Sequence, residues 1–117
     1  MTGSSHGGVD FGKLFVSIDA MDTEAFLAFI AHDGEFRFGS SPPANGHAGI
    51  RAAVEGFFSS FAALRHELQR LIADGDTVVC EGEVTYTRHD GSAITLPFCN
   101  VFETKDGLIA LYRVYID

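Results

Sequence analysis

The second half of the chain, residues 66–117, reads HELQRLIADGDTVVCEGEVTYTRHDGSAITLPFCNVFETKDGLIALYRVYID. Asp-Gly pairs recur in it at even spacing, at Asp74-Gly75, Asp90-Gly91 and Asp106-Gly107. The segments between these pairs are rich in Val, Ile, Thr, Tyr and Phe, which favour strands, whereas Asp-Gly favours hairpin turns. The pattern therefore predicts a four-stranded antiparallel meander.

The length of each hairpin loop decides which side chains share a face of this sheet, because side chains alternate along a strand. A two-residue loop at Asp74-Gly75 would place Glu67 and Gln69 on the apolar face. A three-residue loop, with the glycine in the left-handed conformation, places Leu68 and Ile72 there instead, so we adopt it for all three hairpins. It predicts three cross-strand rows: His66, Gly82, Phe98 and Val114; Leu68, Cys80, Asn100 and Tyr112; and Val84, Leu96 and Ile116.

Composition limits the class of protein. A chain of 117 residues with 46% hydrophobic content is long enough for one domain with a buried core. Sixteen acidic against eight basic residues give a formal charge of −8, which argues against a nucleic-acid or anionic membrane surface. No apolar run approaches the ~20 residues of a membrane span, and the first residues lack a signal-peptide pattern. We therefore expect a cytoplasmic protein with a flexible tail over residues 1–8 and a single domain over residues 9–117.

Helical periodicity dominates the first half of the chain. Helices are expected from Val9 to about Ala20, from Asp22 or Thr23 to Asp33-Gly34, and from Asn45-Gly46 through Phe61, with a short strand at Glu35–Phe38. The mostly apolar face of the meander needs a cover, and the third helix is suited to provide it. The predicted fold class is α+β: a curled antiparallel sheet, made of the four-strand meander plus the short strand, covered by three N-terminal helices. Such a sheet encloses a cone with an internal pocket.

Several motifs occur in an order that is typical of one family. They are Asp22, Pro42-Pro43-Ala44-Asn45-Gly46, Ala48-Gly49-Ile50, Gly75-Asp76, and the closing Asp106-Gly107 and Tyr112-Arg113-Val114-Tyr115-Ile116-Asp117. In these features the chain resembles the SnoaL-like branch of the nuclear transport factor 2-like superfamily, which also holds ketosteroid isomerases and limonene-epoxide hydrolases. The resemblance implies a cone-shaped, commonly dimeric domain with a ligand pocket between the curled sheet and the helices.

The catalytic residues of these relatives have no counterparts in this chain at the corresponding positions. The general base of the isomerases falls at Phe38, and their oxyanion-binding tyrosine falls near Leu14 or Phe15, none of which can exchange a proton. The Asp-Arg-Asp set of the epoxide hydrolases falls at Gly82, Val84 and Val114. The acidic residue of the SnoaL-type cyclases finds no counterpart on the predicted inner face, because three glutamates of the strands are expected to point outward: Glu67, Glu81 and Glu83.

Four polar groups remain on the predicted inner face, at His66, Cys80, Asn100 and Tyr112. His66 is the candidate acid or base, because histidine titrates near neutral pH and Gly82 beside it leaves space; the alternative is a structural histidine. Asn100 and Tyr112 would bind a developing oxyanion, or else satisfy each other. Cys80 is better interpreted as a small buried hydrophobe than as a nucleophile. The predicted ligand-binding residues are Leu14, Phe15, Phe36, Phe38, Phe58, Cys80, Gly82, Val84, Tyr86, Leu96, Phe98 and Val114.

The expected function is binding of a small, largely apolar molecule in the cone, with proton transfer at a carbonyl in the manner of SnoaL-like cyclases or isomerases. The alternative is a non-catalytic ligand-binding or dimerisation module that has lost the family's acids. No cofactor is expected, and no metal, because the five histidines show neither a close pair at ligand spacing nor a carboxylate in register. An apolar patch on the outer sheet face predicts a homodimer through Val101, Ile109, Leu111, Arg113 and Tyr115.

Overall fold

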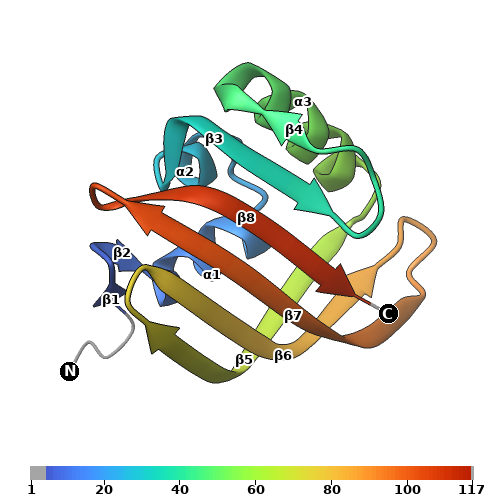
Figure 1. The fold of residues 1–117 in the computed structure, drawn as a ribbon. Coiled ribbons are helices and arrows are strands. Elements are labelled where there is room, and N and C mark those ends of the chain that lie inside the picture. The colour runs from blue at the N-terminus through green and yellow to red at the C-terminus, as the bar shows by residue number, and fades with distance from the viewer. Residues whose placement is uncertain (1–4, 117) are drawn as a thin grey trace.

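A computed structural model describes residues 5–116 of the chain. The α+β architecture that we predicted is confirmed: a curled six-stranded sheet carries the helices on one side, with α1 behind the sheet and α3 along its β3 end (Figure 1). In chain order the elements are β1 (Ser5–His6), β2 (Val9–Asp10), α1 (Phe11–Asp19), α2 (Thr23–Leu27), β3 (Ile30–Phe38), β4 (Ala44–Asn45), α3 (Gly46–Ser59), β5 (Ala63–Asp74), β6 (Thr77–Thr87), β7 (Ala93–Lys105) and β8 (Leu108–Ile116).

The large sheet is mixed, and the expectation of a purely antiparallel sheet was wrong. Its strand order is β4-β3-β8-β7-β6-β5, and β3 runs parallel to β8 with Phe36 opposite Tyr112 and Phe38 opposite Val114. Strand β3 also begins at Ile30, so the second helix is much shorter than predicted. Ile30, which lies within the span that we expected to be helical, begins β3 instead, and the Ile109 amide donates at 2.9 Å to the carbonyl of Phe29 in the preceding turn.

The β5–β6 hairpin departs from the predicted three-residue loop. Asp74 lies opposite Thr77, so the loop has two residues, and the strands return to the expected faces only through a bulge at Gln69. Leu68 therefore packs against the core as predicted, whereas Ile72 is exposed. A bulge bends its strand and re-aims side chains, which explains how this sheet curls. The predicted rows paired His66 with Gly82 and Leu68 with Cys80. In the structure His66 lies opposite Val84 and Leu68 opposite Gly82.

The β6–β7 pairing is confirmed and the β7–β8 pairing is shifted by two residues. Cys80 lies opposite Asn100, Gly82 opposite Phe98 and Val84 opposite Leu96, as predicted. In the last hairpin a register shift near Glu103 places Asn100 opposite Val114 and Phe98 opposite Ile116. A shift of two residues keeps each side chain on its face, so the inner face retains Asn100, Tyr112 and Val114.

Helices α1 and α2 begin at aspartate caps, whereas Asn45 before α3 makes no side-chain cap hydrogen bond. The Asp10 carboxylate accepts from the Lys13 amide at 3.1 Å, and the Asp22 carboxylate accepts from the Ala25 amide at 3.0 Å. The buried side of α1 carries four large apolar residues and packs on the sheet, while α3 buries a second stripe. The two stripes are Phe11, Leu14, Phe15 and Ile18, and Ile50, Val54 and Phe58.

The start of the chain is only partly described. Residues 1–4 of the expected tail lie outside the described residues, whereas Ser5–His6 pair with Val9–Asp10 around a turn at Gly7-Gly8, so this part is a hairpin and not a tail. None of the helices within residues 5–116 has the length and hydrophobicity of a membrane span.

Candidate functional site

A cavity of about 270 Å³ lies between the helices and the inner face of the sheet. Eight aromatic side chains line it, and no Lys, Arg, Asp or Glu side chain is among its lining residues in the described part of the chain. Polar groups enter the wall at His66, Asn100, Tyr112, Tyr86 and Ser41. The full wall consists of Ile18, Phe26, Phe36, Phe38, Ser41, Pro42, Ala44, Ala53, Val54, Phe57, Phe58, His66, Val84, Tyr86, Phe98, Asn100, Tyr112, Val114 and Ile116.

The structure brings the three predicted catalytic residues and most predicted ligand-binding residues to this one cavity. The residues on its wall are His66, Asn100, Tyr112, Phe36, Phe38, Phe58, Val84, Tyr86, Phe98 and Val114. The three strand glutamates that we expected to point outward are absent from the cavity wall: Glu81 is half-buried, and Glu67 and Glu83 are exposed.

Five residues predicted to bind ligand do not line the cavity. Leu14 is fully buried on the inner side of α1, and Phe15 packs behind the wall, 5.1 Å from the His66 ring and 5.7 Å from the Phe98 ring between centroids. Cys80 and Gly82 are buried further along β6, and Leu96 packs against the edge of the core. We had assigned these residues to the pocket because we expected them on the inner side of the fold, but only part of the inner face of the curled sheet borders the cavity.

Sequence reasoning missed wall residues from the helices and from the loop after β3. Ile18 and Val54 belong to the helical stripes described above and Phe57 lies next to Phe58 of the second stripe, so the periodicity was a usable signal. Ser41 and Pro42 lie in an irregular segment whose position no periodicity predicts.

The most important residue that we missed is Asp19, which forms a dyad with His66. One carboxylate oxygen of Asp19 lies 2.6 Å from His66 Nδ1, and the other accepts the His66 backbone N–H at 2.9 Å. The side chains are 27% exposed for Asp19 and 11% for His66. Because a carboxylate accepts, Nδ1 carries the hydrogen in this contact, and Nε2 makes no hydrogen bond within residues 5–116.

Asp19 carries a sequence signal that could have identified it. It is the last residue of α1, where the helix dipole disfavours a negative charge. A carboxylate at such a position needs a partner from elsewhere, and here that partner is the start of β5. The rings of Phe15 and Phe98, the latter 5.2 Å away and edge-on, hold the imidazole in place.

Besides the Asp19–His66 dyad, the cavity wall has a second polar point, which is the neighbouring pair of side chains Asn100 and Tyr112. The Asn100 amide Nδ2 donates to the Tyr112 hydroxyl at 3.5 Å, a long contact, and Asn100 Oδ1 is buried with no hydrogen-bond partner in the described residues. Burial raises the pKa of Tyr112 above its ordinary value, and the nearby Cys80, Tyr86 and Asp19 add to this. Tyr112 therefore keeps its proton and is available as a hydrogen-bond donor.

Cys80 has the properties of a core residue. Burial raises the pKa of its thiol to about 12, with a smaller contribution from Cys99, so no thiolate forms near neutral pH. Cys99 is half-buried opposite Glu81, on the other face of the sheet, and both cysteines are free. The interpretation of Cys80 as a small buried hydrophobe agrees with this environment.

One pair of histidines lies closer than the sequence predicted. The rings of His32 and His47 are 5.3 Å apart, and His47 Nε2 lies 2.8 Å from the Ile30 carbonyl oxygen. The sequence has no histidine pair at ligand spacing, but β3 and α3 bring these two residues together although they are far apart in the chain. No group of three or more His, Cys, Asp or Glu side chains within residues 5–116 is arranged to hold a metal ion.

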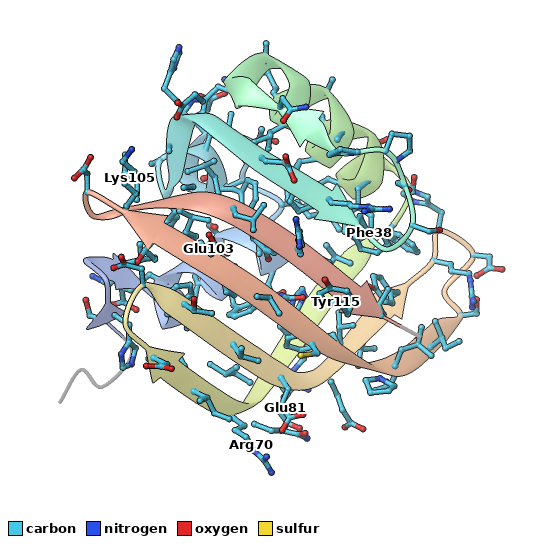
Figure 2. The ribbon with its side chains drawn as sticks, in the orientation of Figure 1. Phe38, Arg70, Glu81, Glu103, Lys105 and Tyr115 are labelled. Atoms are coloured by element: carbon cyan, nitrogen blue, oxygen red, sulfur yellow. The ribbon has the colours of Figure 1, made fainter. Side chains whose placement is uncertain are left out.

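The outer face of the sheet differs in one residue from the patch that we predicted. Tyr115 is 52% exposed, Arg113 is exposed, and Val101 and Leu111 are half-buried. Figure 2 shows Tyr115 and Glu103 on this outer face. Ile109, predicted to belong to the patch, is 0% exposed, because the register shift of the last hairpin turns it into the core.

Comparison with known proteins decides the family. The sequence model of the SnoaL-like domain matches residues 12–112, which is most of the chain. The chain belongs to the SnoaL-like domain family. A search of curated proteins found no match to this SnoaL-like chain.

Solved structures share the fold of this SnoaL-like domain. An NTF2-like protein of unknown function from Burkholderia pseudomallei superposes with a TM-score of 0.87 at 18% identity, covering 96% of this chain and 92% of the other. TerC co-crystallised with polyporic acid gives 0.84 at 22% identity, with coverage of 96% and 92%. An LEH-like epoxide hydrolase from M. tuberculosis gives 0.78 at 20% identity, with coverage of 92% and 79%. At these identities the likeness extends to the NTF2-like cone fold alone.

Proposed function

We propose that the cavity binds a small, neutral, largely apolar molecule that carries a carbonyl group. The aromatic wall without a Lys or Arg side chain supports a neutral ligand, because a buried carboxylate or phosphate without a partner is strongly disfavoured. Its volume of about 270 Å³ supports a ligand of about two fused rings. For comparison, an apolar cavity of about 150 Å³ accommodates benzene.

The proposed reaction is proton transfer at the carbon next to that carbonyl. His66 Nε2 takes the proton as general base and returns it to the same or another carbon, and Tyr112 donates a hydrogen bond to the carbonyl oxygen as negative charge develops there. Asp19 is a positioning residue that holds the imidazole by Nδ1 and stabilises the imidazolium formed in the reaction. The observation that carries this proposal is the Asp19–His66 contact of 2.6 Å on a histidine of the cavity wall.

Hydrogen–deuterium exchange of a ring ketone tests this proposal without knowledge of the natural substrate. We would incubate the protein with 2-tetralone in D₂O and follow the loss of the signals of the protons next to the carbonyl by NMR. The native chain should accelerate exchange, and His66→Gln should lower the acceleration by about 10²-fold or more, the usual contribution of a general base. The matched control is His32→Ala, an exposed histidine away from the cavity, which should exchange the ketone at the native rate. An undiminished rate in His66→Gln would remove His66 from the mechanism.

A non-catalytic binding module is the second candidate. One observation favours it: the strand positions where the isomerases and epoxide hydrolases carry their catalytic residues hold Phe38, Gly82, Val84 and Val114 in this chain. None of these side chains titrates. This candidate predicts that 2-tetralone binds in the cavity while its exchange stays at the rate seen without protein.

We also propose that the outer sheet face pairs with a second copy of the chain. Arg37 and Arg113 lie opposite each other on β3 and β8, whereas Glu83 and Glu103 are exposed on β6 and β7. A two-fold axis through this face would bring Arg37 and Arg113 of each copy towards Glu83 and Glu103 of the other, around the exposed Tyr115.

A further inference from the structure

The second polar point of the cavity wall has an unbalanced set of hydrogen-bonding groups. Asn100 is 2% exposed, and its Oδ1 has no partner within residues 5–116, while its Nδ2 is engaged with the Tyr112 hydroxyl oxygen. A buried acceptor without a donor is costly, and structures satisfy nearly all such groups. This point of the wall therefore lacks a donor.

Tyr112 supplies the complementary half of the same point. Its hydroxyl oxygen receives the Asn100 amide, so its own proton remains free to donate. The aromatic rings of Phe26, Phe36 and Phe102 surround the Tyr112 ring at 5.9, 5.1 and 4.4 Å, and within residues 5–116 its hydroxyl makes no hydrogen bond besides the one from Asn100. The pair thus offers one acceptor, Asn100 Oδ1, and one donor, the Tyr112 O–H.

A hydroxyl group is the common neutral group that both donates and accepts, whereas a bare carbonyl oxygen can only accept. We infer that this point of the cavity selects ligands with a hydroxyl on a ring, a phenol or an enol, which donates to Asn100 Oδ1 and accepts from Tyr112. The inference rests on the proposed function for the location of the ligand's oxygen, and it adds that the enol form of the proposed carbonyl compound, or a phenol of about two rings, binds at this point more tightly than a ketone. A ligand that carries only a ketone leaves the Asn100 acceptor unpaired.

Matched bicyclic probes test the inference by calorimetric titration of the full chain. 2-Naphthol should bind at least about tenfold more tightly than naphthalene, which corresponds to the contribution of one to two hydrogen bonds. 2-Naphthol should also bind more tightly than 2-tetralone, whose oxygen only accepts. Because the chain has no tryptophan, the fluorescence of 2-naphthol gives an independent reading.

Variants assign the preference to this point of the wall. In Asn100→Leu the preference for 2-naphthol over naphthalene should fall to less than about threefold while naphthalene still binds. Tyr112→Phe removes only the hydroxyl and keeps the aromatic ring of the side chain, and it should also lower this preference. The control is Thr104→Val, which removes a buried hydroxyl that donates to the Asp76 carbonyl away from the cavity, and it should keep the native preference. If Asn100→Leu fails to fold by circular dichroism, Tyr112→Phe decides the matter alone.

The outcomes separate this inference from the proposed function. Equal affinities for 2-naphthol and naphthalene, or tighter binding of 2-tetralone, would overturn the inference and leave the cavity as a binding site. Binding of none of the three probes would overturn both.

Discussion

Replacement of Asp19 by asparagine perturbs the contact on which the proposed chemistry depends. The native carboxylate makes two hydrogen bonds to His66, at 2.6 Å to Nδ1 and 2.9 Å to the backbone amide. A hydrogen bond to a charged group contributes about 1.5–3 kcal/mol, and asparagine keeps one acceptor oxygen for one of the two. Since Asp19 is 27% exposed, solvent weakens the electrostatic part, and we expect Asp19→Asn to lower the free energy of unfolding by about 1–2 kcal/mol.

Asp19→Ala removes both hydrogen bonds and should cost about 3 kcal/mol. Asp22→Asn is the matched control, because it also changes a helix-end aspartate that accepts one backbone amide, yet asparagine caps a helix about as well as aspartate. The assays are urea unfolding for stability and exchange of 2-tetralone in D₂O for activity. In Asp19→Asn the exchange should fall by about ten- to a hundredfold, because the histidine loses its orienting carboxylate. A change below about 0.3 kcal/mol together with a native exchange rate would refute the assigned role of Asp19.

Further predictions concern the bend of the sheet, the cysteines and the outer face. A Cβ at Gly82 would lie 1.9 Å from the Glu67 carbonyl oxygen, so Gly82→Ala should destabilise by about 3 kcal/mol or more, whereas Gly56→Ala, which meets nothing in α3, should stabilise by about 0.5–1 kcal/mol in the same urea titration. Cys99 should react with a thiol reagent in the native state and Cys80 only after unfolding; equal reactivity would contradict its burial. Because the pKa of Cys80 is raised from 9.0 to about 12 in the folded chain, its thiol ionises first in the unfolded chain, and stability should fall as pH rises from about 9 towards 12, less steeply in Cys80→Ala. Light scattering at micromolar concentration should report a dimer, and Tyr115→Glu a monomer; a monomeric native chain would argue against pairing through the outer face.

The sequence predicted the meander because its signals are local. Each Asp-Gly pair marks a turn by itself, and the β6–β7 rows follow from one loop. The other two hairpins have two-residue loops at Gly75-Asp76 and Asp106-Gly107, followed by irregularities that restore the faces. A bulge depends on how the sheet curls over the helices, and its position is not encoded in the turn residues. The alternation of side chains between the two faces of each strand was therefore predictable. Which residues lie opposite each other on neighbouring strands was predictable only in part.

The parts that the sequence did not predict depend on contacts between distant segments. Strand β3 pairs with β8, which is far from it in the sequence, and the residues of Ile30–Phe38 alone do not indicate whether that pairing is parallel or antiparallel. Asp19 escaped notice for a related reason, since we searched for acids only on strand faces and this carboxylate reaches His66 from the end of α1. His66, Asn100 and Tyr112 were found because they interrupt an apolar face, which is a property of the strands themselves.

A crystal structure of the protein with 2-tetralone would show whether His66, Asp19 and Tyr112 surround the reacting carbon as proposed. We expect the ketone inside the aromatic cavity, with its oxygen within hydrogen-bonding distance of the Tyr112 hydroxyl and the adjacent carbon facing His66 Nε2 while Asp19 holds Nδ1. A ketone bound outside this cavity, or a His66 ring turned so that Nε2 contacts Asp19 and not the ligand, would contradict it.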